Sequence, residues 1–188
     1  MDKPQRKFGQ KVMPRRTAMI KVEAQEFRDF CQYPVNGHMG KLLMALQACE
    51  ILDFEVVDAE TPTLIDDLPL GDEEARAFPD EDFISIRSDV YDKLFEGCGH
   101  SRFTIAHEFG HLVMHKNVVP SFARGKHQIF EDSEWQADVF ASEFLIDSDL
   151  VDLKTDTPAT VSERCGVSEF AAEVKLNKLK EKLEKEKQ

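Results

Sequence analysis

The sequence predicts an α+β domain that is mostly helical and has a small β-sheet. Apolar residues recur at helical spacing along most of the 188 residues, whereas two short segments have the composition of strands. A hydrophobic content of 41% is sufficient for one domain with its own core. Apolar runs stay below the 18 residues that a membrane-spanning helix needs, so we expect no membrane segment.

The N-terminal half contains the first two predicted helices and both predicted strands. Apolar positions at helical spacing predict helices over residues 20–31 and 42–49. Residues 54–57 are short and partly β-branched, and residues 83–87 alternate apolar with polar side chains, so both segments are typical of strands. The residues between them are rich in proline and acidic side chains, which predicts a loop.

A break at glycine residues separates two helices in the middle of the chain. Residues 89–95 predict a short helix, and residues 101–116 predict a longer one with Ser101 as its N-cap. Gly110 lies inside the longer helix, where glycine costs about 1 kcal/mol relative to alanine. Such a glycine indicates either that another backbone passes close by or that the helix simply tolerates it.

Three further helices complete the expected fold. Ser133 and Gln136 have the spacing of a capping box, so a helix is predicted to begin at Ser133. Two more helices are predicted over residues 158–165 and 168–183, joined by a tight turn at Gly166. The chain is therefore expected to consist of a basic N-terminal arm, a core and a C-terminal helical unit, over residues 1–19, 20–155 and 156–188.

Charge is unevenly distributed along the chain. The formal net charge of −12 argues against a protein that mainly coats nucleic acid, because neutralising phosphates requires clustered Lys and Arg. Residues 1–21 are nevertheless basic, and residues 53–82 are mostly acidic. We interpret the basic arm as a solvated tail, so direct nucleic-acid binding is not expected.

The cysteines and the N-terminus indicate a cytoplasmic protein. The four cysteines are widely spaced and form no C-x-x-C pair, so we expect reduced thiols. The basic N-terminus has no apolar segment of signal-peptide length, and nothing in the sequence is expected to target a membrane.

The most informative motif is His-Glu-Phe-Gly-His at residues 107–111. In a helix, His107 and His111 lie on one face, so both imidazoles can bind the same metal ion. Glu108 then lies beside the ion and can take a proton from the attacking water. This arrangement predicts a zinc hydrolase in which Glu108 is the general base.

A catalytic zinc ion normally has three protein ligands, so the motif needs a partner. His115 would lie two helical turns from His107, about 12 Å along the axis, which is too far for one ion. We interpret His115 as a packing residue or a substrate contact. Position 117, where an extended histidine motif has its third histidine, is Asn. The third ligand can instead be an acidic residue near the helix that begins at Ser133. Spacing does not decide among four candidates: Glu131, Asp132, Glu134 and Asp138.

Two segments resemble the ImmA/IrrE family of zinc metallo-endopeptidases. These are R-F-T-I-A-H-E-F-G-H at residues 102–111 and E-W-Q-A-D-V-F-A-S-E-F-L at residues 134–145. The resemblance implies that residues 20–155 form a zincin-like metalloprotease core with a gluzincin-type site, similar to that of thermolysin. It also implies the roles of individual residues: one zinc ion is bound by His107, His111 and Glu134, and Glu108 is the general base.

Other side chains are expected to support these groups. Asp138 lies one turn after Glu134 and is expected to accept the free ring N–H of a ligating histidine, which would fix its tautomer. A second electrophile is expected to help hold the oxyanion. The sequence leaves five donors open for this role: Tyr91, His100, Arg102, His115 and His127.

The same resemblance implies a biological role. Members of the family cleave a helix-turn-helix repressor encoded nearby, so we expect a protein substrate of this kind and derepression of its genes. The alternative is a non-cleaving protein-binding partner in a regulatory or toxin–antitoxin pair. Residues 156–188 resemble the family's C-terminal unit, which is helix-turn-helix-like in some members. Two departures, Phe109 for the usual Leu and Ile146-Asp147 for Met-Pro, do not involve a ligand.

Overall fold

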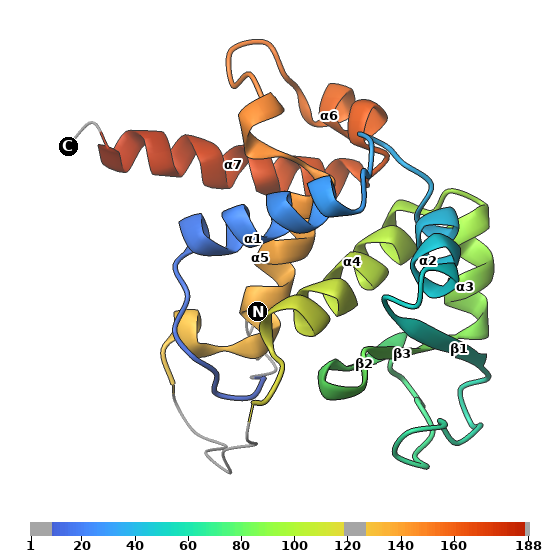
Figure 1. The fold of residues 1–188 in the computed structure, drawn as a ribbon. Coiled ribbons are helices and arrows are strands. Elements are labelled where there is room, and N and C mark those ends of the chain that lie inside the picture. The colour runs from blue at the N-terminus through green and yellow to red at the C-terminus, as the bar shows by residue number, and fades with distance from the viewer. Residues whose placement is uncertain (1–8, 119–126, 187–188) are drawn as a thin grey trace, which may run out of the picture.

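The computed structural model describes residues 9–118 and 127–186 and has the expected α+β class. A small sheet lies at one end, α2 and α3 lie beside it, and α4 leads from the sheet to a group of crossing helices (Figure 1). None of the helices in these ranges is both long and apolar enough to cross a membrane. The helices are α1 (Thr17–Phe30), α2 (Met39–Ala48), α3 (Ser88–Phe95), α4 (Gly99–Met114), α5 (Ser133–Leu145), α6 (Pro158–Cys165) and α7 (Glu169–Glu186).

The sheet contains one strand that the sequence did not predict. Its order is β1 (Asp53–Val57), β3 (Phe83–Arg87) and β2 (Ala75–Phe78), with β1 parallel and β2 antiparallel to β3. The unexpected strand is β2, which lies within the loop expected from its acidic and proline-rich composition. β2 forms one edge of the sheet and packs against α4. The sheet therefore reaches the helix that carries the motif.

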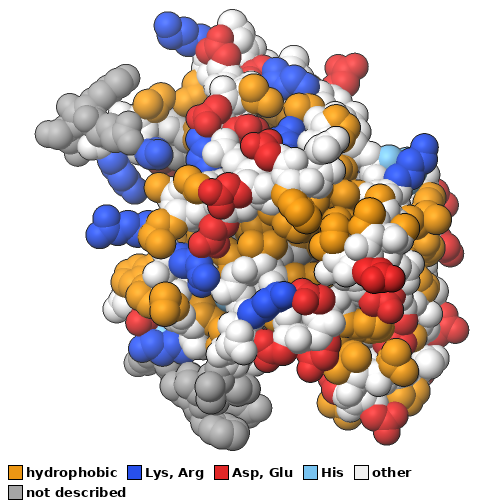
Figure 2. Space-filling view, in the orientation of Figure 1, with side chains coloured by type: hydrophobic (Ala, Val, Ile, Leu, Met, Phe, Trp, Pro, Cys, Tyr) orange, Lys and Arg blue, Asp and Glu red, His pale blue; other side chains and the backbone are white. Residues whose placement is uncertain are grey.

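Acidic side chains are numerous on the side of the molecule that contains the sheet. In Figure 2 they gather at the lower right, whereas most Lys and Arg side chains of this face lie further to the left. This distribution agrees with the acidic composition of residues 53–82, which include β1 and β2.

Aromatic side chains from three helices form the centre of the core. The ring centroids of Phe27 and Phe109 are 5.4 Å apart, and those of Phe140 and Phe144 are 6.1 Å apart. Phe109, Phe140 and Phe144 are fully buried. These contacts join α1, α4 and α5, the last two of which carry the predicted metal ligands.

α4 and α5 approach each other closely at Gly110. A Cβ atom at this position would lie 3.0 Å from Ala137 Cα and 3.1 Å from Phe140 Cβ. Few real Cβ contacts are as short, so a side chain here would push the two helices apart. Of the two explanations for a glycine inside this helix, the close approach of another backbone is therefore correct.

The ends of α4 and α5 differ from the prediction. α4 begins at Gly99, so Ser101 is a buried residue of its first turn and not the N-cap, and the helix ends at Met114, two residues earlier than expected. α5 begins at Ser133, but its N-cap is Asp132, whose side chain accepts a hydrogen bond from Trp135 N at 2.9 Å. The predicted capping box is wrong, because the side chains of Ser133 and Gln136 form hydrogen bonds with other segments of the chain.

The C-terminal helices share the core of the rest of the chain. Val161 and Cys165 of α6 and Leu176 of α7 belong to the same buried apolar cluster as the central helices. Lys175 Nζ also forms a buried ion pair with Glu143 Oε1 of α5 at 2.7 Å. The boundary expected between residues 155 and 156 stays a prediction, and packing is continuous across it.

We predict that Gly110→Ala destabilises the protein by about 1–2 kcal/mol. Alanine improves helix propensity by about 1 kcal/mol, but its Cβ would meet the backbone of α5, which cannot move aside easily. Gly40→Ala is the matched control, because the nearest atoms to the added Cβ belong to the ring tip of Phe95, the far end of a side chain that is 44% exposed. Urea unfolding should show a loss for Gly110→Ala and a change within about 0.5 kcal/mol for Gly40→Ala. Equal effects would contradict this account of Gly110.

Candidate metal centre

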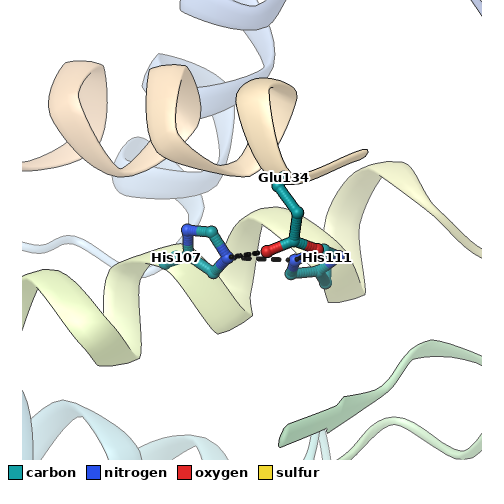
Figure 3. A group of neighbouring side chains, drawn as sticks. All are labelled: His107, His111 and Glu134. Carbon is teal, nitrogen blue, oxygen red and sulfur yellow. Dashed lines mark hydrogen bonds and ion pairs between the residues drawn. The ribbon is translucent and has the colours of Figure 1, made fainter. Parts of the chain in front are cut away.

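α4 and α5 bring the three predicted ligands together. His107 and His111 project from one face of α4, and Glu134 projects toward them from the first turn of α5 (Figure 3). Each histidine Nε2 atom lies 3.4 Å from one carboxylate oxygen of Glu134, and the two Nε2 atoms are 3.1 Å apart. One ligand atom from each residue lies within 4.8 Å of the other two.

The chemistry of these groups fits a metal ion. Two imidazole nitrogens and one carboxylate oxygen are the protein ligands of one class of catalytic zinc site, which keeps a fourth position for water or substrate. Because α4 presents both imidazoles on one face and α5 presents the carboxylate from the opposite side, the three donors converge on one point. Spacing had left four acidic residues open, and within the described ranges the structure brings Glu134 to both histidines.

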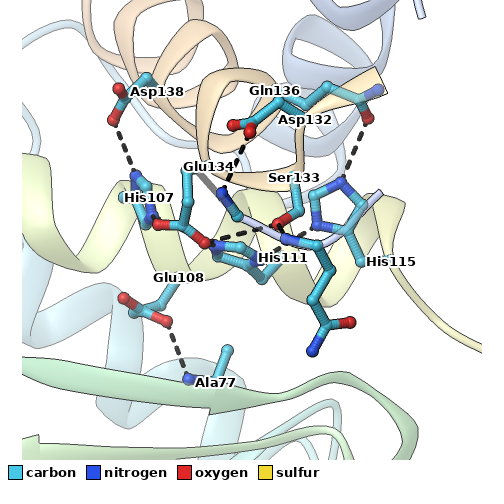
Figure 4. Close-up of polar contacts among 12 residues, drawn as sticks. Ala77, His107, Glu108, His111, His115, Asp132, Ser133, Glu134, Gln136 and Asp138 are labelled. Atoms are coloured by element: carbon cyan, nitrogen blue, oxygen red, sulfur yellow. Dashed lines mark hydrogen bonds and ion pairs between the residues drawn. The ribbon is translucent and has the colours of Figure 1, made fainter. Parts of the chain in front are cut away.

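Asp138 supports His107 as the sequence predicted. Its Oδ1 atom lies 3.0 Å from His107 Nδ1 (Figure 4). An ionised carboxylate can only accept a hydrogen bond, so Nδ1 is the donor and Nε2 faces the ligand cluster. The contact that the sequence predicted between Asp138 and a histidine of the motif is therefore present, and the role of His107 as a metal ligand stays a prediction.

Glu108 is buried beside the cluster and is held by β2. One of its carboxylate oxygens accepts a hydrogen bond from Ala77 N at 2.8 Å. Burial raises the pKa of Glu108 to about 7, with a further increase from the negative charge of Glu134 and an opposing effect of His107. A carboxyl group with this pKa exchanges a proton near neutral pH, which suits a general base. Its catalytic role stays a prediction.

The three clustered residues shift one another's pKa values: that of His107 is raised, and those of Glu134 and His111 are lowered. Burial lowers the pKa of His107, but hydrogen bonds to Asp138 and Glu134 and the charges of nearby carboxylates raise it overall to about 10. The hydrogen bond from His107 is the largest effect on Glu134 and lowers its pKa. Burial, followed by the charge of His107, lowers the pKa of His111. Metal binding would therefore displace a proton from His107, because a ligating imidazole must offer a lone pair.

A cleft of about 610 Å³ gives access to these groups. Its walls include Ala75 and Ala77 of β2 on one side and Gly9 and Gln10 on another. A Cβ atom on Gly9 would lie 2.8 Å from Glu134 N, so this segment passes against the start of α5.

From Gly9 onward, the basic arm forms a wall of the cleft. Val12 N donates a hydrogen bond to Glu131 O at 2.8 Å, and Ser133 N donates one to Gln10 O at 3.0 Å. The interpretation of the arm as a solvated tail is therefore wrong from Gly9 onward, because its backbone pairs with the residues that precede α5. Residues 1–8 lie outside the described part of the chain.

Four of the five candidate oxyanion donors are not among the residues that line the cleft. His100 binds Glu74 at 2.9 Å, and Arg102 binds Asn36 and the Gly166 carbonyl oxygen. Tyr91 packs among Phe54 and Phe95, and His127 lies 2.9 Å from Asp132 Oδ2.

Two further residues border the cleft, and the structure favours packing over substrate contact for His115. His115 borders the cleft but is only 5% exposed, and its ring nitrogens bind His111 and Gln136, so it is not placed as a substrate contact. Arg76 also lines the cleft, and its guanidinium is held by Asp66 and Glu73. Arg76 escaped the sequence analysis because β2 itself was not predicted.

Comparison with known families places this site within a known domain. Residues 98–177 match the peptidase M78 family, described as the IrrE N-terminal-like domain. This stretch of the chain is similar to that family. The match contains α4 and α5 and therefore all three residues of the cluster, and it confirms the resemblance seen in the two sequence segments. The IrrE N-terminal-like domain indicates a metallopeptidase. No curated protein sequence matches the chain.

We predict that Glu108→Gln stabilises the metal-free IrrE-like domain increasingly as the pH rises. Unfolded Glu108 ionises near pH 4.5, whereas the folded residue does so near pH 7, so wild-type protein loses stability over this interval. Glutamine removes this loss, which amounts to up to about 3 kcal/mol at pH 8. Urea unfolding in the presence of a chelator, at a series of pH values from 5 to 8, measures the difference.

The matched control for this prediction is Glu134→Gln. The folded pKa of Glu134 is lowered, so its charge contributes stability above pH 4.5, and the substitution should destabilise the metal-free protein. A constant difference between Glu108→Gln and wild type across the pH range would contradict the prediction.

Proposed function

We propose that the chain is a zinc-dependent endopeptidase that cleaves a partner helix-turn-helix transcriptional repressor and thereby releases the repressed genes. The observation that supports this proposal best is the convergence of His107, His111 and Glu134 beside the buried carboxyl group of Glu108. The match of residues 98–177 to a metallopeptidase family agrees with it.

The chain's own residues divide the chemistry among them. His107, His111 and Glu134 would hold the zinc ion, which supplies a Lewis acid for a carbonyl group and for water. Glu108 would accept a proton from the attacking water through the carboxylate oxygen that Ala77 does not bind, and would return this proton to the leaving amine. The hydrogen bond to Ala77 holds the carboxyl group in place during both transfers.

The edge of β2 offers a place for an extended peptide. Ala77 directs its N–H toward Glu108, so this side of β2 faces the cleft and not β3. Backbone groups on an exposed strand edge can pair with an added strand. A substrate lying here would have its backbone next to the proposed base and ligands, which favours a polypeptide substrate.

The charge of the cleft favours a basic partner. The lining of the cleft includes four acidic side chains and the basic side chain of Arg76 in β2. The acidic residues are Glu73, Asp80, Glu108 and Glu134. A protein that binds DNA carries clustered Lys and Arg, so its potential would complement this surface. This complementarity supports a repressor as the substrate.

We predict that Glu108→Gln abolishes cleavage and leaves zinc bound. Glutamine cannot accept the proton, so the rate should fall at least about 100-fold, whereas the three ligands are unchanged. The measurement combines zinc content per chain with mass spectrometry of a candidate helix-turn-helix repressor after incubation. Glu173→Gln is the matched control, because it makes the same chemical change at an exposed position of α7.

Two results would contradict the proposal. Unchanged cleavage by Glu108→Gln would show that Glu108 is not the base. A stable complex of the wild-type chain with the helix-turn-helix protein, uncleaved at saturating zinc, would instead favour a non-cleaving binding partner.

A further inference from the structure

His115 belongs to a chain of hydrogen bonds that ends at a proposed metal ligand. His115 Nε2 lies 3.2 Å from Gln136 Oε1, and His115 Nδ1 lies 3.0 Å from His111 Nδ1 (Figure 4). Gln136 is fully buried and His115 is 5% exposed. The orientation of Gln136, at the other end of these hydrogen bonds, determines where their protons lie.

The orientation of Gln136 is fixed by its backbone partners. Its amide nitrogen donates to Met13 O at 2.9 Å and to Phe130 O at 2.8 Å. A carbonyl oxygen can only accept, so the NH₂ group must face these two atoms and Oε1 must face His115. Oε1 also accepts a hydrogen bond from Arg15 Nη1 at 3.3 Å.

The protonation of His115 follows from the orientation of Gln136. Because Oε1 is an acceptor, His115 Nε2 must carry a proton. A second proton on Nδ1 would create a buried imidazolium close to the partly buried Arg15 guanidinium, which shares the same oxygen, and burying a charge beside a like charge is unfavourable. His115 is therefore neutral, with a lone pair on Nδ1.

We propose that His115 is a positioning residue that fixes the tautomer of His111. Two Nδ1 atoms 3.0 Å apart need one donor, so His111 Nδ1 carries the proton and its Nε2 offers a lone pair toward Glu134. The inference rests on the proposed metal site. It gives His111 the same kind of support that Asp138 gives His107, but through a neutral and buried partner.

The experiment compares His115→Asn with His115→Phe. The amide oxygen of Asn occupies roughly the place of the imidazole Nδ1 atom and can accept the His111 N–H, whereas Phe retains a ring but has no acceptor. Long-range ¹H–¹⁵N correlation of the metal-free protein reports which nitrogen of His111 is protonated, and competition with a chromogenic chelator reports zinc affinity.

In the wild-type protein and His115→Asn we expect His111 to be protonated on Nδ1. In His115→Phe this tautomer should no longer predominate, and zinc affinity should fall about 10–100-fold. Met114→Ala is the matched control for general loss of packing, because Met114 is an adjacent buried residue outside the hydrogen-bond chain. Its zinc affinity and its His111 tautomer should remain those of wild type.

Different results overturn the two proposals. His111 protonated on Nε2 in the wild-type protein would overturn the role of His115, and this measurement needs no variant to fold. Unchanged tautomer and zinc affinity in His115→Phe would overturn it as well. A wild-type chain that binds no zinc would contradict the proposed function, while the tautomer would still decide the role of His115.

Discussion

The close packing of α4 against α5 at Gly110 is the constraint on which the site depends. Because Gly110 has no side chain, the backbone of α5 at Ala137 can lie in contact with α4. One turn before Ala137, Glu134 then reaches His107 and His111 across the gap. A wider separation would move the carboxylate away from both imidazoles and leave two ligands without the third.

Each functional group is held by a partner from another segment of the chain. β2 holds Glu108 through one backbone N–H, and α5 supplies Asp138 to His107. The N-terminal segment contributes through Gln136, whose amide is fixed by Met13 and which contacts His115. Such outer partners determine the direction of lone pairs and protons, so the geometry of the site depends on contacts between segments far apart in the sequence.

Local patterns predicted most of the fold and part of the site. The 107–111 motif specified its own geometry because four residues make about one helical turn. Spacing left the third ligand open, and resemblance was needed to choose Glu134. β2 was missed because Ala-Arg-Ala-Phe is too short to show a period, and its pairing with β3 decides its structure. The capping box failed because Ser133 Oγ accepts from Gln10 N and Gln136 binds distant groups.

The pairing of residues 9–12 with residues 131–133 also affects the order in which the protein can assemble. The two segments of this contact are separated by about 120 residues, so during translation the first of them waits on the order of ten seconds for the second. Contacts between such distant segments form late, because closing a long loop costs conformational entropy before the contacts can offset that cost. The cleft wall is thus completed only after α4 and the start of α5 have been synthesised, which delays a finished cleft until most of the chain exists.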